Sequence, residues 1–256
     1  MTTTRTAAFF DLDRTLIAGS SAFVFARAAR DAGHIRLQDF VPDVVRAVHF
    51  RFFGSSDESS TGVRDRILAG VGGMQQSDLV GLNEIVLPEL LGLIRPEARA
   101  LLEQHHRAGR ETWIVSASPI EIVEPLATAL GMTGGIGTRA EVDNGIYTGR
   151  LEGPFCYGEG KAEAISRLAE ERGINLAESW SYSDSMSDVP MMEIVGHAVA
   201  VNPDTELAGL SRARGWPVVI FAQRSKMLIR RSTTATLMSA VLVIVYSLGL
   251  RQGRKR

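Results

Sequence analysis

The spacing of hydrophobic and polar positions changes twice along the chain. Residues 6–10 form a short apolar run without alternation, which predicts a buried strand. From about residue 20 to residue 94, apolar residues recur at helical spacing and no convincing strand interrupts them. From residue 95 to residue 221, apolar runs alternate with amphipathic helical patterns. This strand–helix alternation predicts an α/β protein with a doubly wound, mainly parallel sheet and an inserted helical module.

The helical stretch predicts a cap placed between two parts of a core. Its last helix begins with Ser77 as the predicted N-cap. We expect a cap over residues 18–94 and a catalytic core formed by residues 1–17 and 95–223. The predicted cap helices span residues 20–33, 37–54, 61–70 and 77–94.

The remaining strands and helices of the core follow residue 95. Asn144 and Gly145 lie between two alternating runs and predict a type I′ hairpin. Helices are predicted over residues 95–110, 121–132 and 160–173. Strands are predicted over residues 111–118, at the start of 180–188, and over 197–202 and 216–221.

Composition excludes several classes of protein. A hydrophobic fraction of 45% with 22% charged residues is not that of a disordered chain. The single cysteine, Cys156, excludes an internal disulfide framework and any site that needs several cysteines. The formal net charge of −1 argues against nucleic acid as the main partner. The composition leaves the oligomeric state open.

That net charge is the sum of two unlike segments. Residues 1–206 carry 18 basic and 29 acidic groups, whereas residues 207–256 carry ten basic groups and no acidic one. Within the tail (residues 224–256), residues 232–250 are 19 uncharged residues with four basic residues on each side. We expect residues 232–250 to form a C-terminal hydrophobic helix that spans a membrane. The alternative is a helix packed on the core or on a second subunit. Because the apolar run at residues 7–10 is too short for a secretory signal, we expect a cytoplasmic catalytic domain anchored to the cell membrane.

Two acidic side chains directly follow the first predicted strand. Asp11 and Asp13, two residues apart, can converge on one hard cation. One of them can also attack an electrophile while the other transfers protons. The same Asp-x-Asp spacing occurs in ordinary loops, so by itself it leaves both interpretations open.

A hydroxyl and an ammonium group are candidates for binding an anion. Ser116 lies near the end of a predicted strand, with Ser118 two residues later, and a hydroxyl there can hold a phosphate oxygen. Serines at strand ends also form turns. Lys161, one of only three lysines, follows Gly158 and Gly160 at a predicted helix N-terminus, where an anion is favoured. The alternative is a solvated surface lysine.

A second acidic pair follows a later strand. Asp184 and Asp188 are four residues apart, a spacing that suits a Mg²⁺ ligand with an orienting carboxylate. The alternative is an aspartate that caps the next helix.

The order of these motifs, FFDLDRTL, WIVSAS, GEGK and SDSMSD, resembles that of the haloacid dehalogenase superfamily of phosphohydrolases. The resemblance covers residues 6–221 and is closest to subfamily IB, the phosphoserine phosphatase-like proteins, which carry a helical cap between the first two motifs. It implies a Mg²⁺-dependent phosphomonoesterase in which Asp11 is the nucleophile and Asp13 the general acid and base. It implies phosphate binding by Thr15, Ser116 and Lys161. It implies a metal site formed by Asp11, Asp13 through its backbone carbonyl, Asp184 and Asp188.

One departure from that subfamily concerns the substrate. Phosphoserine phosphatases usually have a glutamate after the first motif for the substrate ammonium, but here Ser20 and Ser21 occur and no acid follows until Asp31. Ser20 is therefore a candidate substrate-binding residue. Arg64 or Arg66 could contact a substrate carboxylate or a second phosphate, and the alternative is that both lie on a solvated face of a cap helix. We expect a small phosphorylated metabolite such as phosphoserine or histidinol phosphate. The alternatives are a phosphorylated lipid headgroup, a phosphotransferase reaction, and a non-catalytic regulator with the same fold.

Overall fold

The computed structural model describes residues 5–33, 68 and 71–221. Its first elements are β1 (Ala7–Asp11), α1 (Ser21–Asp31), α4 (Gln76–Gly81), α5 (Asn83–Leu93), α6 (Pro96–Arg107), β2 (Glu111–Pro119) and α7 (Ile120–Ala129). They are followed by β3 (Gly134–Thr138), β4 (Ala140–Asp143), β5 (Ile146–Leu151), α8 (Glu159–Arg172) and β6 (Trp180–Ser183). The last are α9 (Val189–Glu193), β7 (His197–Val201), α10 (Thr205–Arg214) and β8 (Val218–Val219).

Six strands form one parallel sheet with β1 near its centre. The strand order is β3-β2-β1-β6-β7-β8, and every neighbouring pair is parallel. The chain moves outward from β1 to β2 and β3 on one side and later fills β6, β7 and β8 on the other. This reversal places a ligand crevice at the carboxyl end of β1, where the loops after neighbouring strands diverge. The α/β class and the mainly parallel sheet are confirmed.

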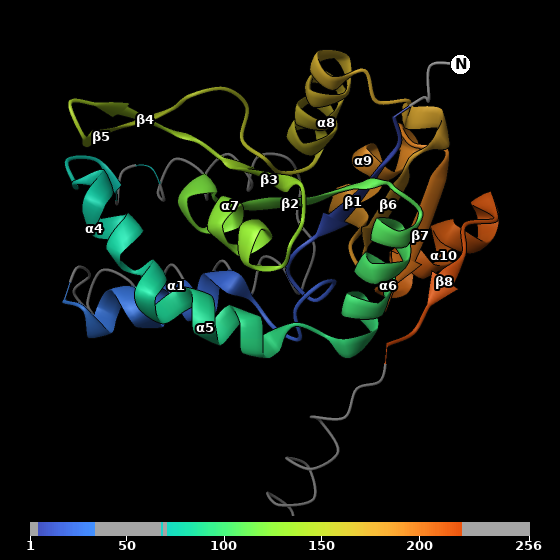
Figure 1. Cartoon of the computed structure of the whole chain (residues 1–256), viewed down its shortest axis with the longest axis horizontal. Coiled ribbons are helices and arrows are strands. Elements are labelled where there is room, and N and C mark those ends of the chain that lie inside the picture. The colour runs from blue at the N-terminus through green and yellow to red at the C-terminus, as the bar shows by residue number, and fades with distance from the viewer. Residues whose placement is uncertain (1–4, 34–67, 69–70, 222–256) are drawn as a thin grey trace, which may run out of the picture. The chain divides into compact units, whose positions relative to one another are not determined.

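Helices cover both faces of this sheet (Figure 1). On one face, Phe9 of β1 belongs to the same buried cluster as Ile165 of α8 and Met191 of α9. On the other face, the ring of Phe10 lies 5.8 Å from that of His105 of α6. Because successive side chains of a strand point to opposite faces, a strand buried on both sides is apolar throughout. This explains why β1 shows no alternation of polar and apolar residues.

Strand β3 is formed by a sequence that favours turns rather than strands. A Cβ atom at Gly134 would lie 2.5 Å from the ring of Trp113, and one at Gly135 would lie 2.7 Å from Val123. The glycines therefore allow β3 to approach β2 and α7 closely. Local propensity gave no signal for this strand, because the reason for its glycines lies in residues distant in sequence.

A separate two-stranded hairpin, formed by β4 and β5, contacts α4. In the turn between β4 and β5, Asn144 and Gly145 both have positive φ, 50° and 81°, as the predicted type I′ turn requires. The backbone N–H of Gln76 donates to the carbonyl of Gly145 at 2.9 Å. Figure 1 shows α4 close to this hairpin, and both α4 and α5 contact α7.

Two predicted elements differ from the structure. The helix expected over residues 77–94 is two helices, α4 and α5, and Gln75 rather than Ser77 is the first N-cap. The strand expected over residues 216–221 pairs only at Val218 and Val219. It is an edge strand, and Pro217 before it has no N–H to donate.

Other predictions lie largely or wholly outside the described residues. The helices expected over 37–54 and 61–70 and the membrane helix expected over 232–250 belong to this group. Among the residues that are described, no helix is long and apolar enough to cross a bilayer.

Candidate active site

The loop after β1 is held by backbone hydrogen bonds rather than by regular structure. Ile17 N–H donates to the carbonyl of Leu12 at 3.0 Å, and Arg14 N–H donates to that of Gly19 at 3.0 Å. Arg14 has a φ of 63°, a left-handed conformation that a non-glycine residue adopts at some cost. This loop places Asp11 at the end of the strand and Asp13 two residues later, both at most 5% exposed.

Two glycines form the turn that leads into α8. Gly158 is the N-cap with a φ of 55°, and a Cβ atom at Gly160 would lie 1.9 Å from the carbonyl oxygen of Phe155. A side chain at position 160 would push the first turn of α8 away from the preceding segment. These glycines therefore fix the helix start, and with it the position of Lys161.

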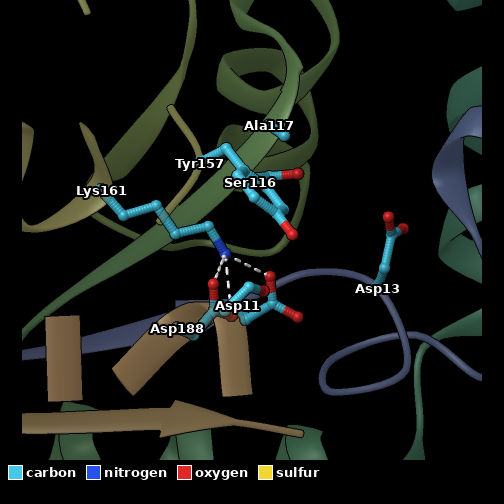
Figure 2. Close-up of a pocket in the computed structure, with 8 residues that line it drawn as sticks. Asp11, Asp13, Ser116, Ala117, Tyr157, Lys161 and Asp188 are labelled. Atoms are coloured by element: carbon cyan, nitrogen blue, oxygen red, sulfur yellow. Dashed lines mark hydrogen bonds and ion pairs between the residues drawn. The ribbon is translucent and has the colours of Figure 1, made fainter. Parts of the chain in front are cut away.

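Lys161 lies between Asp11, the last residue of β1, and Asp188, which follows β6 (Figure 2). Its Nζ atom is 2.7 Å from Oδ1 of Asp11 and 2.8 Å from Oδ1 of Asp188. Asp188 also accepts a hydrogen bond from Ser183 Oγ at 2.6 Å. All three charged residues are at most 4% exposed. The cluster brings three predicted site residues together although 150 positions separate Asp11 from Lys161.

The environment keeps Lys161 charged. Burial by itself lowers the pKa of this ammonium group, but the negative charges of Asp11 and Asp188 outweigh that effect. The pKa of Lys161 therefore lies well above its ordinary value. A permanent positive charge at the end of β1 suits the binding of an anion.

Asp13 lies across the pocket from this cluster, as Figure 2 shows. Its Oδ1 atom accepts a hydrogen bond of 2.6 Å from the backbone N–H of Ser21, the first residue of α1. The hydroxyl groups of Ser21 and Ser118 are 2.8 Å apart, and Ser118 N–H donates to Ser116 Oγ at 3.2 Å. The small pocket is lined by Asp11, Asp13, Ser116, Ala117, Tyr157, Lys161, Ser187 and Asp188.

Asp184 is buried beside the pocket and forms an ion pair. Its Oδ2 atom is 2.9 Å from Nε of Arg14, and the aspartate is 1% exposed. In the part of the chain that the structure describes, no three acidic, histidine or cysteine side chains are grouped as a ready metal site. Asp11 and Asp188 share Lys161, whereas Asp184 faces Arg14.

The donor set nevertheless fits a hard divalent cation. Asp11, at the end of β1, and Asp184 and Asp188, after the adjacent strand β6, provide carboxylate oxygens, the ligands that Mg²⁺ prefers. Together with Asp13, these three make four buried carboxylates at this end of the sheet. Burying several carboxylates together is costly unless cations compensate their charge, which a divalent cation would do.

Two further predicted residues, Thr15 and Ser20, do not line the pocket. Thr15 is 1% exposed, and its hydroxyl has no hydrogen-bond partner among the described residues. Ser20 is the N-cap residue of α1, but its side chain makes no capping hydrogen bond. Arg64 lies outside the described residues.

Sequence reasoning missed several contributors to the site. Ser183 is the last residue of β6, much as serines lie near the end of β2. A hydroxyl residue at the end of a buried strand was therefore a signal that the sequence offered. The pairing of Arg14 with Asp184 and the lining by Tyr157 and Ser187 had no such signal, because each depends on loop geometry.

Comparisons with known proteins agree with this arrangement. The sequence profile of the haloacid dehalogenase-like hydrolases matches residues 8–193, which include the whole site. A phosphoserine phosphatase of Mycobacterium tuberculosis is 39% identical over 214 residues, 83% of this chain and 70% of that protein. A histidinol-phosphatase of Neisseria meningitidis is 36% identical over 144 residues, 55% of this chain and 63% of that protein. A crystal structure of a Bordetella pertussis protein of unknown function is 28% identical with a TM-score of 0.73, covering 85% of this chain and 99% of that one.

Proposed function

Since this chain belongs to the haloacid dehalogenase-like hydrolase family and is a phosphatase, we propose that it hydrolyses phosphomonoesters through an aspartyl-phosphate formed on Asp11. The observation that carries the proposal is Lys161, charged and buried between Asp11 and Asp188 in a pocket at the end of β1. A nucleophilic carboxylate beside a fixed cation is what transfer of a phosphoryl anion requires.

The proposed reaction has two steps. First, a carboxylate oxygen of Asp11 attacks phosphorus, the bond from phosphorus to the leaving oxygen breaks, and Asp13 gives its proton to that oxygen. Then Asp13 takes a proton from a water molecule, which attacks the phosphorus and releases inorganic phosphate from Asp11. Lys161 and Ser116 hold the phosphoryl oxygens during both steps.

We propose that the carboxylates of Asp11, Asp184 and Asp188 and the backbone carbonyl of Asp13 would hold Mg²⁺. The cation would supply charge neutralisation on the phosphoryl oxygens. The ion pair with Arg14 occupies Oδ2 of Asp184, so the other carboxylate oxygen, Oδ1, is the one proposed to reach the cation. Thermal unfolding measured against MgCl₂ tests this without any substrate: we expect stabilisation of the parent chain and less stabilisation of Asp184→Asn. Equal responses of both proteins would contradict the metal assignment.

The substrate proposed is a small phosphorylated metabolite. The names of two relatives, a phosphoserine phosphatase and a histidinol-phosphatase, support this class. We propose that residues 18–94 act as the cap over the core formed by residues 1–17 and 95–223, with Ser20 and Arg64 as candidate substrate contacts. A screen of phosphate release from amino-acid, amino-alcohol, sugar, polyol and lipid phosphates tests it. Activity confined to lipid phosphates would contradict a small metabolite.

Asp11→Asn tests the chemistry. The amide cannot form the acyl-phosphate, so we expect phosphate release to fall to background. The variant should still fold in the absence of Mg²⁺. Exposed Asp31, placed at the far end of α1, provides Asp31→Asn as the control with parent activity. A folded parent chain that releases no phosphate from any substrate would instead favour the non-catalytic regulator. Added alcohol acceptors that take up the phosphoryl group would reveal a phosphotransferase.

We also propose that the tail, residues 224–256, attaches the phosphatase to a membrane, which would bring phosphorylated lipid headgroups within reach. The support is the sequence alone, 19 uncharged residues with four basic residues on each side. The test compares fractionation of the full chain with that of a chain ending at Gln223. We expect only the full chain in the membrane fraction, and equal solubility of both would contradict the attachment.

A further inference from the structure

We propose that Ser21 and Ser118 are positioning residues that orient Asp13 for proton transfer to the leaving oxygen. The inference rests on the proposed function, in which Asp13 is the proton donor. It concerns two serines that belong to α1 and β2 and have no role in the reaction scheme above.

The first contact is between Asp13 and the start of α1. Ser21 is the first helical residue, and its backbone N–H, which has no acceptor within the helix, donates to Oδ1 of Asp13 at 2.6 Å. A carboxylate at the N-terminus of an 11-residue helix also interacts favourably with the helix dipole. One oxygen of Asp13 is therefore fixed by a helix that follows it by eight positions.

The second contact fixes that helix to the sheet. The side chain of Ser21 is 2% exposed, and its hydroxyl lies 2.8 Å from that of Ser118 near the end of β2. The backbone N–H of Ser118 donates to Oγ of Ser116, the candidate phosphate ligand. The serine pair thus connects the place where the phosphoryl group binds with the group that protonates the leaving oxygen.

This connection matters because proton transfer depends strongly on geometry. As the bond from phosphorus to the leaving oxygen breaks, the proton of Asp13 passes to that oxygen, and the transfer is efficient only at hydrogen-bonding distance. A displaced Asp13 would slow reactions that need the proton and leave others unaffected. A serine pair that merely stabilises the fold would show no such selectivity.

Two substrates of similar size separate these roles. Benzyl phosphate expels an alkoxide, which needs a proton, whereas 4-nitrophenyl phosphate expels a stable phenolate, which does not. The ratio of their kcat/KM values reports on the phosphorylation step and on proton donation within it. Asp13→Asn shows how far the ratio moves when the donor is lost altogether.

Substitutions at position 21 separate the two contacts. Ser21→Ala removes the hydroxyl but keeps the N–H, whereas Ser21→Pro removes both. Proline is well tolerated at the first position of a helix, and Ser20 before it is already extended. We expect Ser21→Pro to lower kcat/KM for benzyl phosphate about tenfold and for 4-nitrophenyl phosphate less than about twofold. Ser21→Ala and Ser118→Ala should change the ratio in the same direction by a smaller factor.

Ser211→Ala is the matched control, since Ser211 is a buried serine of α10 that lines no part of the pocket. Its ratio should equal that of the parent. Equal slowing of both substrates, or no slowing of either, in folded Ser21→Pro overturns the inference. If Ser21→Pro does not fold, Ser118→Ala decides by the same criterion. Retained activity in Asp11→Asn would overturn the proposed function itself. If Asp11→Asn is inactive but Ser21→Pro has the same substrate ratio as the parent, only the positioning role is overturned.

Discussion

At the scale of single residues, the central feature of the site is a basic side chain buried among carboxylates. Lys161 is one of three lysines in the chain, and it is buried between Asp11 and Asp188. The sequence indicated its importance through the rarity of lysine, the two glycines before it and the order of the motifs. Lys161 contacts these two carboxylates because β1 and β6 are neighbours in the sheet. The spacing of residues along the sequence does not reveal which distant strands pair.

Replacing Lys161 by methionine should lower the free energy of unfolding by about 3 kcal/mol, because two buried carboxylates lose their shared cation. Urea denaturation measures the change. The control is Arg107→Gln, which breaks an exposed ion pair with Glu103 one helical turn away and should cost less than about 1 kcal/mol. Similar losses in both variants would show that the buried cluster contributes no more than a surface pair.

At the scale of elements, glycines decide where α8 and β3 begin and how closely they pack. Gly160 lies against the Phe155 carbonyl, and Gly134 lies against Trp113. Both positions look like weaknesses in a helix and a strand when propensity alone is considered. In the structure they are the points where a side chain would not fit.

Gly160→Ala should displace the start of α8 and move Lys161, because the new methyl group has no space beside the backbone of Phe155. We expect a loss of at least about 2 kcal/mol in unfolding free energy and a large fall in kcat. Gly209→Ala is the matched control in α10, where nothing lies within 4 Å and the backbone is helical. It should stabilise the chain by about 0.5 to 1 kcal/mol in the same urea titration. A harmless Gly160→Ala would contradict the role given to this turn.

A second prediction at this scale concerns His105, which packs α6 against the sheet. Burial first, then the charges of Arg110 and His106, lower its pKa from 6.5 to about 4. Because the folded state resists protonation more than the unfolded state, stability should fall as pH decreases from about 6.5 to about 4. His105→Gln, which keeps a side chain able to bond to Tyr182, should make this fall shallower. Denaturation at several pH values measures it, with exposed His197→Gln as the control, and identical slopes in His105→Gln and the parent would refute it.

At the scale of the whole described chain, α4, α5, the hairpin and α7 meet at one half-buried residue, Glu121. Glu121 at the start of α7 accepts hydrogen bonds from Tyr147 Oη at 2.9 Å and from Gln76 Nε2 at 3.2 Å. Its backbone carbonyl accepts a third from Asn83 Nδ2 at 2.7 Å. Burial, followed by the charge of Glu121, raises the pKa of Tyr147, so the phenol remains a hydrogen-bond donor. Glu121, which directly follows the end of β2 and Ile120, thus connects α4, α5 and the β4–β5 hairpin with α7.

Tyr147→Phe should lower the free energy of unfolding by about 1 kcal/mol, and Glu121→Ala by about 2 kcal/mol, since the latter leaves the buried phenol without its acceptor. Chemical denaturation measures both. Glu124→Ala, on the exposed side of the same helix, should change the stability by less than about 0.5 kcal/mol. If Glu121→Ala behaves like Glu124→Ala, the contact contributes nothing to joining these elements.

The sequence by itself determined the α/β class, the buried character of β1, the type I′ turn and the main candidate residues at strand ends. These features depend on local periodicity, on backbone conformations open to few residue types, and on the tendency of parallel strands to carry functional groups at their carboxyl ends. Only the tertiary structure decided that Lys161 contacts both Asp11 and Asp188, that Arg14 holds Asp184, and that Ser21 holds Asp13. Each of these contacts joins side chains from different elements. Their distances are set by strand order and helix packing, which no local pattern encodes.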